Sequence, residues 1–346
     1  MSRLNLLMTG AGAPGGPGII RCFKEGESKI KLFTGDADEM ASGRFLSENF
    51  LLLPLASEKN FIGQLKDICV SNDIQMIFPL VTLELFKLSE ARDEFKSSGI
   101  EIVVSDYRGL SVANNKHELY RSLVSDDIDI PEFYVARNFE EIRRACHSLG
   151  YPERPVVIKP SVSNGSRGVR ILDEEASDFD LLFNHKPNNL YSNLEKIKKI
   201  LDNRDFPELL ISEYLPGEEI TVDTIACNGE MKVILIRTRD KMNGGISTAG
   251  TFINDPLVAH QCKLIIEKLN LNGPIGFQFK KSESNRYCLL EINPRIQGTS
   301  VSGLGVGFNL PLLSIEYFLD KNKPSILSDL PPTKFVRYYE EVFIKR

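Results

Sequence analysis

Two adjoining stretches of the chain decide its fold, and each is predicted to be a β-strand: Gly276-Phe277-Gln278-Phe279-Lys280 and Tyr287-Cys288-Leu289-Leu290-Glu291-Ile292-Asn293-Pro294-Arg295. Polar residues alternate with apolar ones along both, as in half-buried strands. Residues 282–285 between them are polar and predict a hairpin loop. If Lys281 faces Arg286, the alternation directs four side chains into the core, namely Leu290, Ile292, Phe277 and Phe279.

The other face of this hairpin carries one carboxylate and two amides. Glu291 and Asn293 point to one side, and Gln278 joins them diagonally from the neighbouring strand. Hard oxygen ligands of this kind suit Mg²⁺, which takes its other ligands from phosphates and water. Arg295 and Gln297 follow with the same parity, which brings a guanidinium beside metal-bound phosphates. The competing interpretation is a half-exposed strand whose polar side chains face water.

Two further stretches indicate contacts to a nucleotide. Lys159 ends the apolar strand 156–160, and the loop 161–168 after it offers backbone amides and hydroxyls that can wrap phosphate oxygens. The alternative is a hairpin turn rich in Ser and Gly. In 210–223, a strand runs through a Pro-Gly turn into another strand, so that extended backbone at 212–215 can pair with an adenine edge and Glu219 can reach ribose hydroxyls.

The N-terminal glycines are also compatible with a different ligand, a dinucleotide. Residues 10–15 match the pattern GxGxxG after a strand, and Asp36 ends the second strand near the place of a ribose-binding acid. NAD(P) binding by a dehydrogenase is therefore an alternative. Pro14, Gly16 and Pro17 argue against it because they distort the turn.

The order of predicted elements gives an α/β and α+β architecture. Strands at 4–8, 29–34, 74–78 and 100–104 alternate with helices, which predicts a parallel sheet with helices on both faces. From residue 209 onward strands return, after a polar segment at 176–208 that we interpret as an insertion. We divide the chain into three domains, at 1–110, 111–212 and 213–346.

Composition excludes several classes of protein. With 346 residues, a net charge of −5, 42% hydrophobic and 26% charged residues, the chain is ordinary for a globular protein and lacks the basic surplus of a non-specific nucleic-acid binder. Six scattered cysteines without a CxxC pair indicate reduced thiols. No signal-peptide core and no apolar run of ~18 residues is present, so we expect a cytoplasmic protein without a membrane partner.

The order of these motifs resembles the ATP-grasp superfamily, most closely its carbamoyl-phosphate-synthase-like and amino-acid ligase branch. The resemblance covers nearly the whole chain. It rests on the N-terminal glycine turn, Asn-Asn-Lys at 114–116, Val-Val-Ile-Lys-Pro at 156–160, the glycine loop, Glu-Tyr-Leu-Pro-Gly-Glu-Glu at 213–219, and Gln278 with Glu-Ile-Asn-Pro-Arg at 291–295. It implies an ATP-grasp fold preceded by a Rossmann-like, parallel-sheet pre-ATP-grasp domain, with 111–212 as the small lid subdomain and 213–346 as the large subdomain.

The resemblance also implies a role for individual residues. ATP would be contacted by Lys116, Lys159, Ser163, Gly165, Ser166, Gly168, Glu213, Tyr214, Leu215, Glu219 and Gln278. Mg²⁺ or Mn²⁺ would be bound by Gln278, Glu291 and Asn293. Catalytic contacts would come from Arg295, Lys159 and Arg237. Asn115 stands where relatives often carry Asp, which leaves the role of Lys116 less well supported.

In such enzymes a carboxylate attacks the γ-phosphate of ATP, and an amine captures the acylphosphate. We therefore expect a carboxylate–amine ligase of the acid–amino-acid type, with small carboxylate and amine substrates; a homodimer also fits the family. The alternatives are a carbamoyl-phosphate-synthase-like subunit and a non-catalytic ATP-binding protein.

Overall fold

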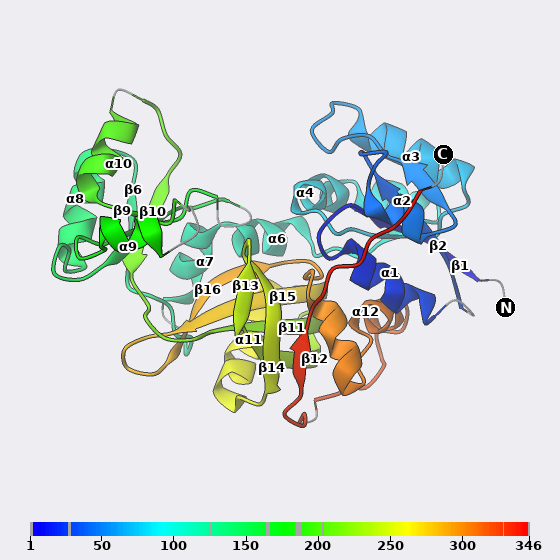
Figure 1. Cartoon of the computed structure of the whole chain (residues 1–346). Coiled ribbons are helices and arrows are strands. Elements are labelled where there is room, and N and C mark those ends of the chain that lie inside the picture. Colours follow the sequence, from blue (N-terminus) through cyan, green and yellow to red (C-terminus); the bar gives the residue numbers. More distant parts are fainter. Residues whose placement is uncertain are drawn as a thin grey trace. The chain divides into compact units, whose positions relative to one another are not determined.

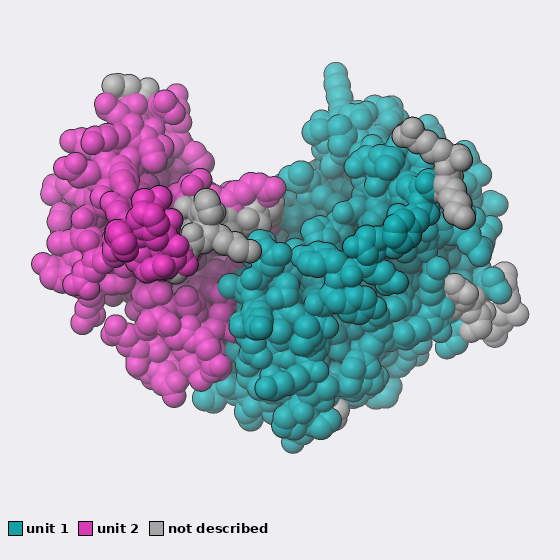
Figure 2. Space-filling view, in the orientation of Figure 1, with its two compact units in different colours: residues 1–113, 220–278, 292–346 teal, residues 114–219, 279–291 magenta. Residues whose placement is uncertain are grey.

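The computed structural model describes residues 3–26, 29–124, 126–163, 167–184, 189–202, 204–327 and 329–344. They form two compact units (Figure 2). Unit 1 comprises residues 1–113, 220–278 and 292–346, and unit 2 comprises 114–219 and 279–291. The predicted three-domain division stays a prediction, and the units are described separately below.

The first part of unit 1 is the predicted parallel sheet (Figure 1). Its strand order is β3-β2-β1-β4-β5, and the strands are β1 (Leu4–Thr9), β2 (Ile30–Asp36), β3 (Phe50–Leu52), β4 (Met76–Phe78) and β5 (Glu101–Ile102). The helices between and after them are α1 (Gly16–Lys24), α2 (Ser42–Leu46), α3 (Phe61–Ser71), α4 (Thr82–Glu90), α5 (Arg92–Ser97) and α6 (Tyr107–Asn114). All four predicted strands are present, and the α/β class is confirmed.

The central strand β1 explains why this sheet is covered on both faces. Leu6, Leu7 and Met8 are fully buried in a row, which is the pattern of a strand inside a parallel sheet. Leu6 and Met8 belong to one core cluster, and Leu7 belongs to another. Alternate side chains of β1 therefore fill two separate apolar layers.

Unit 2 contains an antiparallel sheet with one parallel edge, ordered β6-β10-β7-β8-β9. Its strands are β6 (Phe133–Ala136), β7 (Val156–Pro160), β8 (Arg170–Leu172), β9 (Tyr191–Ser192) and β10 (Leu209–Glu213). Its helices are α7 (Lys116–Leu123), α8 (Phe139–Ser148), α9 (Asp178–Phe183) and α10 (Leu194–Leu201). The sequence also predicts helices at 139–148 and 194–201, and α8 and α10 confirm them.

The large sheet has the order β13-β14-β12-β11-β15-β16, and β17 pairs with β14. Its strands are β11 (Glu219–Cys227), β12 (Glu230–Thr238), β13 (Lys241–Asn243), β14 (Ile246–Ile253), β15 (Gly273–Lys281), β16 (Tyr287–Asn293) and β17 (Lys334–Val336). The remaining helices are α11 (Pro256–Leu269), the 3₁₀ helix η1 (Ser300–Val306) and α12 (Leu310–Leu319). Sequence patterns predicted β11, β12, β15, β16 and both α-helices, but not β13, β14 or β17.

The β15–β16 hairpin exists, but its predicted register was wrong at the loop. Ser282 N donates to Arg286 O at 2.9 Å, so Ser282 rather than Lys281 faces Arg286. The Lys281 ammonium instead lies 4.7 Å from the ring centre of Tyr287. Phe277, Phe279 and Ile292 are buried as predicted, whereas Leu290 is only half-buried.

All six cysteines are buried and free, as expected for reduced thiols. Burial raises the pKa of Cys69 and Cys146 to about 12, so these thiols are poor nucleophiles.

Within the described ranges, no helix has the length and apolar composition needed to cross a membrane.

The N-terminal glycine turn packs directly on the loop after β16. A Cβ added at Gly15 would lie 2.2 Å from Gly298 Cα, which is backbone and cannot move aside as a side chain would. We therefore expect Gly15→Ala to destabilise unit 1 by about 1–3 kcal/mol, the usual cost of overpacking. Thermal unfolding should show a melting temperature several degrees lower. Gly305→Ala is the matched control, because a Cβ there meets no atom within 4 Å; equal melting temperatures for the two variants would contradict this packing.

Candidate functional site

Lys116 is the first residue of α7, and the residue before it fixes its position. The Asn115 side chain accepts hydrogen bonds from His117 N at 3.0 Å and Glu118 N at 3.2 Å, so it caps the helix. Asn and Asp are equally good N-cap residues. Asn115 therefore keeps the capping role that Asp would have, and Lys116 is held in a buried position.

The Lys116 ammonium joins two predicted parts of the site. Its Nζ lies 3.4 Å from Glu291 Oε2 and donates to Ser163 O at 3.4 Å. Its backbone N donates to Ser161 O at 2.8 Å. The start of the 161–168 loop and the predicted metal carboxylate are thus linked through one lysine inside unit 2.

Lys159 is buried beside this pair. Its Nζ donates to the Tyr120 hydroxyl at 3.1 Å, and that hydroxyl donates to Leu290 O at 2.9 Å. The ammonium also lies 5.1 Å from the Tyr120 ring centre. Tyr120 was not predicted as a site residue, because a tyrosine on an amphipathic helix looks like any other core aromatic.

The electrostatics of Lys159 show that this cluster lacks negative charge. Burial, with a smaller effect of the Lys116 charge, lowers the Lys159 pKa to about 7, and Glu291 opposes both effects. Burial also raises the pKa of Tyr120, with Glu291 adding to the effect. Two lysines share one carboxylate in a poorly solvated place, so an incoming anion would be stabilised there.

The 161–168 loop is anchored at both ends. Glu208 Oε1 accepts from Ser161 Oγ at 2.9 Å and lies 2.8 Å from His117 Nδ1. Gly168 has a φ of +80°, and a Cβ there would lie 2.7 Å from Pro160 Cγ, so this turn requires glycine. Gly165 and Ser166 lie outside the described residues. Glu208 was missed because we took residues 176–208 for an insertion.

The segment 213–219 has the predicted strand–turn–strand course, and the structure limits its contacts. Glu213 N donates to Glu132 O at 3.0 Å, so an adenine contact at this residue would have to use its carbonyl. Leu215 is buried, and the Lys280 ammonium lies 5.2 Å from the ring centre of Tyr214.

The two glutamates of this turn, Glu218 and Glu219, differ in their surroundings. Glu218 accepts from Lys281 at 2.5 Å and from Tyr287 at 2.7 Å, which lowers its pKa. Glu219 is half-buried and begins β11. The ribose contact predicted for Glu219 stays a prediction.

In unit 1, Arg237 is one of the most deeply buried side chains. Its Nε donates to Asp223 Oδ2 at 3.0 Å, and Asp223 Oδ1 accepts from Gln297 Nε2 at 3.1 Å and from Ser300 Oγ at 2.6 Å. A Cβ at Gly276 would lie 2.2 Å from the Gln297 side chain, so glycine makes room for this amide. Asp223 and Ser300 were not predicted, since neither belongs to a local motif.

Arg295 lies where β16 has already ended. Its Nε donates to Thr82 Oγ1 at 3.0 Å, and its Nη1 donates to Ile296 O at 2.8 Å. Thr82 begins α4, so Arg295 joins the loop after β16 to the parallel-sheet part of unit 1. Gln278 and Asn293, the amides of the predicted metal set, are both half-buried on neighbouring strands of the large sheet.

Asp36 forms hydrogen bonds to the backbone of the N-terminal turn and of the residues that follow β2. Asp36 Oδ2 accepts from Gly12 N at 2.7 Å, and its Oδ1 accepts from Asp38 N at 3.0 Å. The carboxylate that a dinucleotide site would offer to a ribose is therefore engaged in holding the turn. Nearby, Thr9 donates to Glu84, and burial raises the pKa of Glu84 to about 7.

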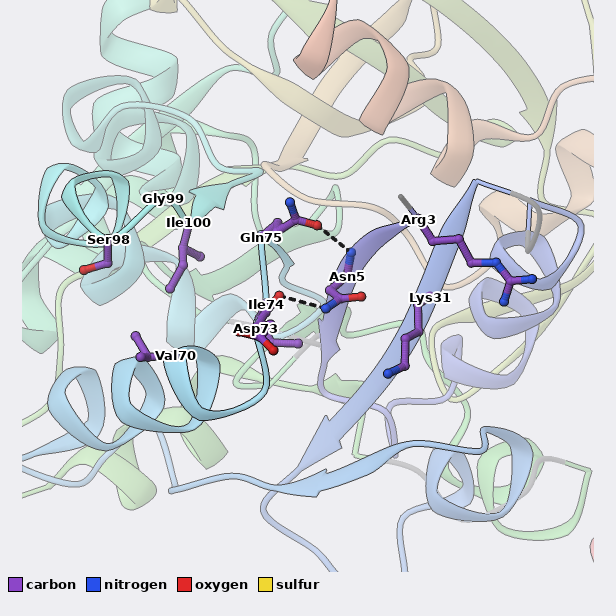
Figure 3. A pocket seen from close by; sticks show the side chains of 10 residues that line it. All are labelled: Arg3, Asn5, Lys31, Val70, Asp73, Ile74, Gln75, Ser98, Gly99 and Ile100. Carbon is purple, nitrogen blue, oxygen red and sulfur yellow. Dashed lines mark hydrogen bonds between the residues drawn. The ribbon is translucent and has the colours of Figure 1, made fainter. Parts of the chain in front are cut away.

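The structure also has a pocket that none of these residues lines (Figure 3). It lies at the amino ends of β1 and β2, and its polar groups bind one another. The Asn5 side chain donates to Asp73 O at 2.9 Å, and the Asn5 backbone N donates to Gln75 Oε1 at 3.1 Å. Ligands of parallel sheets bind at the carboxyl ends of the strands. We therefore do not assign this pocket to the functional site.

Comparisons with known proteins match two parts of the chain to families. Residues 205–340 match the family model "ATP-grasp in the biosynthetic pathway with Ter operon", and residues 6–103 match "PylC-like, N-terminal domain". The chain is 24% identical over 219 residues to the arginine-specific carbamoyl phosphate synthase large chain of Bacillus subtilis. It is 21% identical over 265 residues to the N-terminal section of the carbamoyl phosphate synthase large chain of Aquifex aeolicus. These matches use 60% and 71% of this chain but only 19% and 44% of the relatives.

Solved structures share the fold at low identity. The ADP complex of an N5-carboxyaminoimidazole ribonucleotide synthetase has a TM-score of 0.72 at 14% identity, covering 97% of this chain and 83% of that one. The L-amino acid ligase of Bacillus licheniformis has a TM-score of 0.64 at 15% identity, covering 92% and 75%.

The buried Lys159 predicts a pH dependence of stability. The unfolded chain keeps this proton up to a pKa near 10.5, whereas the folded chain releases it near 7. Above pH 7 the unfolded state thus binds more protons, and the free energy of unfolding rises with pH. We expect a slope of up to about 1.4 kcal/mol per pH unit between pH 7 and 8 that Lys159→Met lacks.

Urea unfolding at closely spaced pH values measures this slope. The window stops at pH 8 because buried cysteines, whose pKa is raised, give the opposite slope at higher pH. Lys199→Met, at an exposed position of α10, is the control and should keep the slope. Equal slopes for wild type and Lys159→Met would mean that Lys159 stays charged in the folded protein.

Proposed function

Because the chain belongs to the ATP-grasp superfamily, we propose that it is an ATP- and Mg²⁺-dependent ligase that activates a carboxylate for capture by an amine. One observation carries the proposal: Lys116 and Lys159 are buried together beside Glu291, at the base of a Ser- and Gly-rich loop. Burying two ammonium groups near one carboxylate is unfavourable unless an anion joins them. The phosphates of ATP supply that anion.

The donor set on the β15–β16 hairpin fits Mg²⁺. Glu291 and Asn293 are two residues apart on β16, so their side chains leave the same face. Gln278, on the adjacent strand, stays in the set because the resemblance implies it, since the register observed at the loop does not give it the same face. One carboxylate and two amide oxygens leave room for phosphate and water ligands, as Mg²⁺ prefers. The Lys116 contact at 3.4 Å supports the assignment, because the Glu291 carboxylate already lies beside a cation. Bound there, the metal would neutralise charge on the phosphates.

The proposed reaction needs no side-chain nucleophile. A carboxylate oxygen of the donor attacks the γ-phosphorus of ATP, the bond to the bridging oxygen breaks, and ADP leaves. The amine nitrogen then attacks the acyl carbon, inorganic phosphate leaves, and the nitrogen loses a proton. The protein contributes position and positive charge, which Lys159, Lys116 and Arg295 carry. Buried cysteines with a raised pKa agree with a reaction that uses no thiol.

Further assignments belong to the same proposal. Glu213, Tyr214 and Leu215 line the adenine side, and Glu219 lies on the ribose side. The substrates are small molecules, the compartment is the cytoplasm, and a homodimer is the expected assembly. The second candidate is a carbamoyl-phosphate-synthase-like subunit, favoured by the sequence relatives.

Nucleotide binding can be tested by thermal unfolding with Mg-ATP, with ATP alone and with NAD(P)H. A ligand that binds only the folded state stabilises it by about 2.7 kcal/mol at 100 times its dissociation constant. We expect a clear increase in melting temperature with Mg-ATP, most of which is lost without Mg²⁺. An increase with NAD(P)H alone would reverse the assignment and restore the glycine turn as a dinucleotide site.

Chemistry can be tested by trapping the acylphosphate with hydroxylamine, across a panel of carboxylates, while ADP release is followed. Glu291→Gln keeps the shape of the side chain and removes its charge. We expect it to lower turnover by about 100-fold or more, since even indirect partners of a metal ligand contribute 10- to 100-fold. Its melting temperature without nucleotide should fall, because Lys116 and Lys159 lose their shared countercharge, so activity is compared at a temperature where both proteins are folded.

The control for that variant is Glu283→Gln in the exposed hairpin loop. It should keep full activity. Full activity of Glu291→Gln would remove the metal assignment, whereas ADP release without hydroxamate in the wild type would favour plain ATP hydrolysis over carboxylate activation.

A further inference from the structure

Arg237 has one nitrogen that the protein does not use. The side chain is 1% exposed, and its Nη1 has no hydrogen-bond partner among the described residues. A buried donor without an acceptor is destabilising, and folded proteins rarely keep one. An acceptor supplied by a ligand would satisfy it.

The rest of the guanidinium is fixed in orientation. Asp223 Oδ2 holds Nε at 3.0 Å, and Asp223 itself is held through its Oδ1 by Gln297 at 3.1 Å and Ser300 at 2.6 Å. Asp223 therefore cannot turn to cover Nη1 without losing two hydrogen bonds. The free edge of Arg237 is preorganised.

Strand pairing brings a second arginine to the same face. Arg237 faces Phe252 of β14, and Gly250 of β14 faces Phe335 of β17. Paired residues share a face and so do alternate residues along a strand, which assigns Arg237, Phe335 and Arg337 to one side of the sheet. The Arg237 guanidinium lies 5.8 Å from the Phe335 ring centre, in agreement with this register.

Arg337 connects this face to the glycine turn. Its Nη2 donates to Pro14 O at 3.1 Å, and its backbone N donates to Thr248 O at 2.8 Å. Figure 1 shows the C-terminal segment, in red, passing alongside α1. Burial lowers the Arg337 pKa, Tyr339 opposes this, and the Arg237 charge lowers it further. The two guanidinium groups thus repel each other, and an anion near both would relieve the repulsion.

We propose that Arg237 and Arg337 bind a second carboxylate of the substrates, one that is not activated. This inference rests on the proposed ligase function and narrows its substrate class. Guanidinium groups recognise carboxylates through paired hydrogen bonds, and the free edge of Arg237 is suited to one of them.

The position in the sheet explains why this carboxylate is not the reacting one. In the strand order β12-β11-β15, Arg237 is two strands away from Gln278. Two strand spacings amount to roughly 10 Å. A group bound at Arg237 is therefore an anchor, and the substrate that carries it is either a dicarboxylate donor or an amine with its own carboxylate, such as an amino acid.

The first test uses acetate as the probe and needs no turnover. Thermal unfolding is measured while acetate replaces chloride at constant ionic strength. We expect acetate to stabilise the wild type, and Arg337→Met and Arg237→Met to weaken the apparent affinity at least tenfold. Arg108→Met, at an exposed position of α6, should behave as wild type. An acetate effect that is absent in the wild type, or unchanged in Arg337→Met, overturns the proposal.

If Arg237→Met does not fold, Arg337→Met alone tests the carboxylate site. Arg337 is only half-buried, so we expect this variant to fold. Arg337→Met should keep the Mg-ATP shift of the wild type. Loss of that shift in the wild type would refute the ligase function and leave the acetate result standing, so the two failures can be told apart.

The second test identifies which substrate carries the anchor. With a non-hydrolysable Mg-ATP analogue present, calorimetry compares L-alanine with L-alaninamide, and glutarate with its monoamide. A preference for L-alanine that Arg337→Met removes assigns the carboxylate to the amine substrate. The same result for glutarate assigns it to the donor. If the wild type shows no preference in either pair, the assignment to a substrate is wrong.

Discussion

The structure of unit 2 depends on how it stabilises a buried ammonium group. Lys159 is surrounded by protein and lies close enough to Lys116 for their charges to repel. Tyr120 gives it one hydrogen bond, and Glu291 provides the nearby negative charge. This arrangement holds β7, α7 and β16 in fixed relation, because each contributes one of these groups. The proposed phosphate-binding face is therefore fixed by contacts within the protein.

In unit 1 the buried charge, Arg237, is compensated by a carboxylate of its own. Arg237 has a full countercharge in Asp223, and two further donors fix that carboxylate. The charge balance of Arg237 is satisfied, but its hydrogen bonds are not. Lys159 shares its nearby carboxylate with Lys116, whereas Arg237 has its own carboxylate and lacks one acceptor among the described residues. The first arrangement suits a multiply charged group, and the second suits a single small oxyanion.

Sequence reasoning identified the residues that lie in short, ordered motifs. Lys159, Glu291 and Asn293 stand on regular strands, where alternation fixes the direction of each side chain, and Lys116 follows an Asn that caps a helix. The parallel sheet was predictable for the same reason, since β1, β2 and β4 are compact apolar runs. In this sheet only β3 was not predicted, because its three residues are at most half-buried.

What sequence reasoning missed was set by contacts between distant segments. Asp223, Ser300 and Arg337 have no local pattern, and they act together only through the pairing of β11, β12, β14 and β17. The hairpin register also failed, because a loop residue, Ser282, closes the turn with its backbone. Alternation predicts which side a residue faces but does not determine where a loop begins.

The glycine turn shows how one pattern can serve different purposes. In a dinucleotide-binding fold its glycines let the backbone approach a pyrophosphate, and a following acid binds ribose. Here Asp36 binds the turn itself at Gly12, and Gly15 admits the backbone of Gly298 instead of a ligand. Close approach is the property that glycine provides in both cases. The partner that uses it differs, because the loop after β16 and Arg337 reach this turn from the far end of the chain.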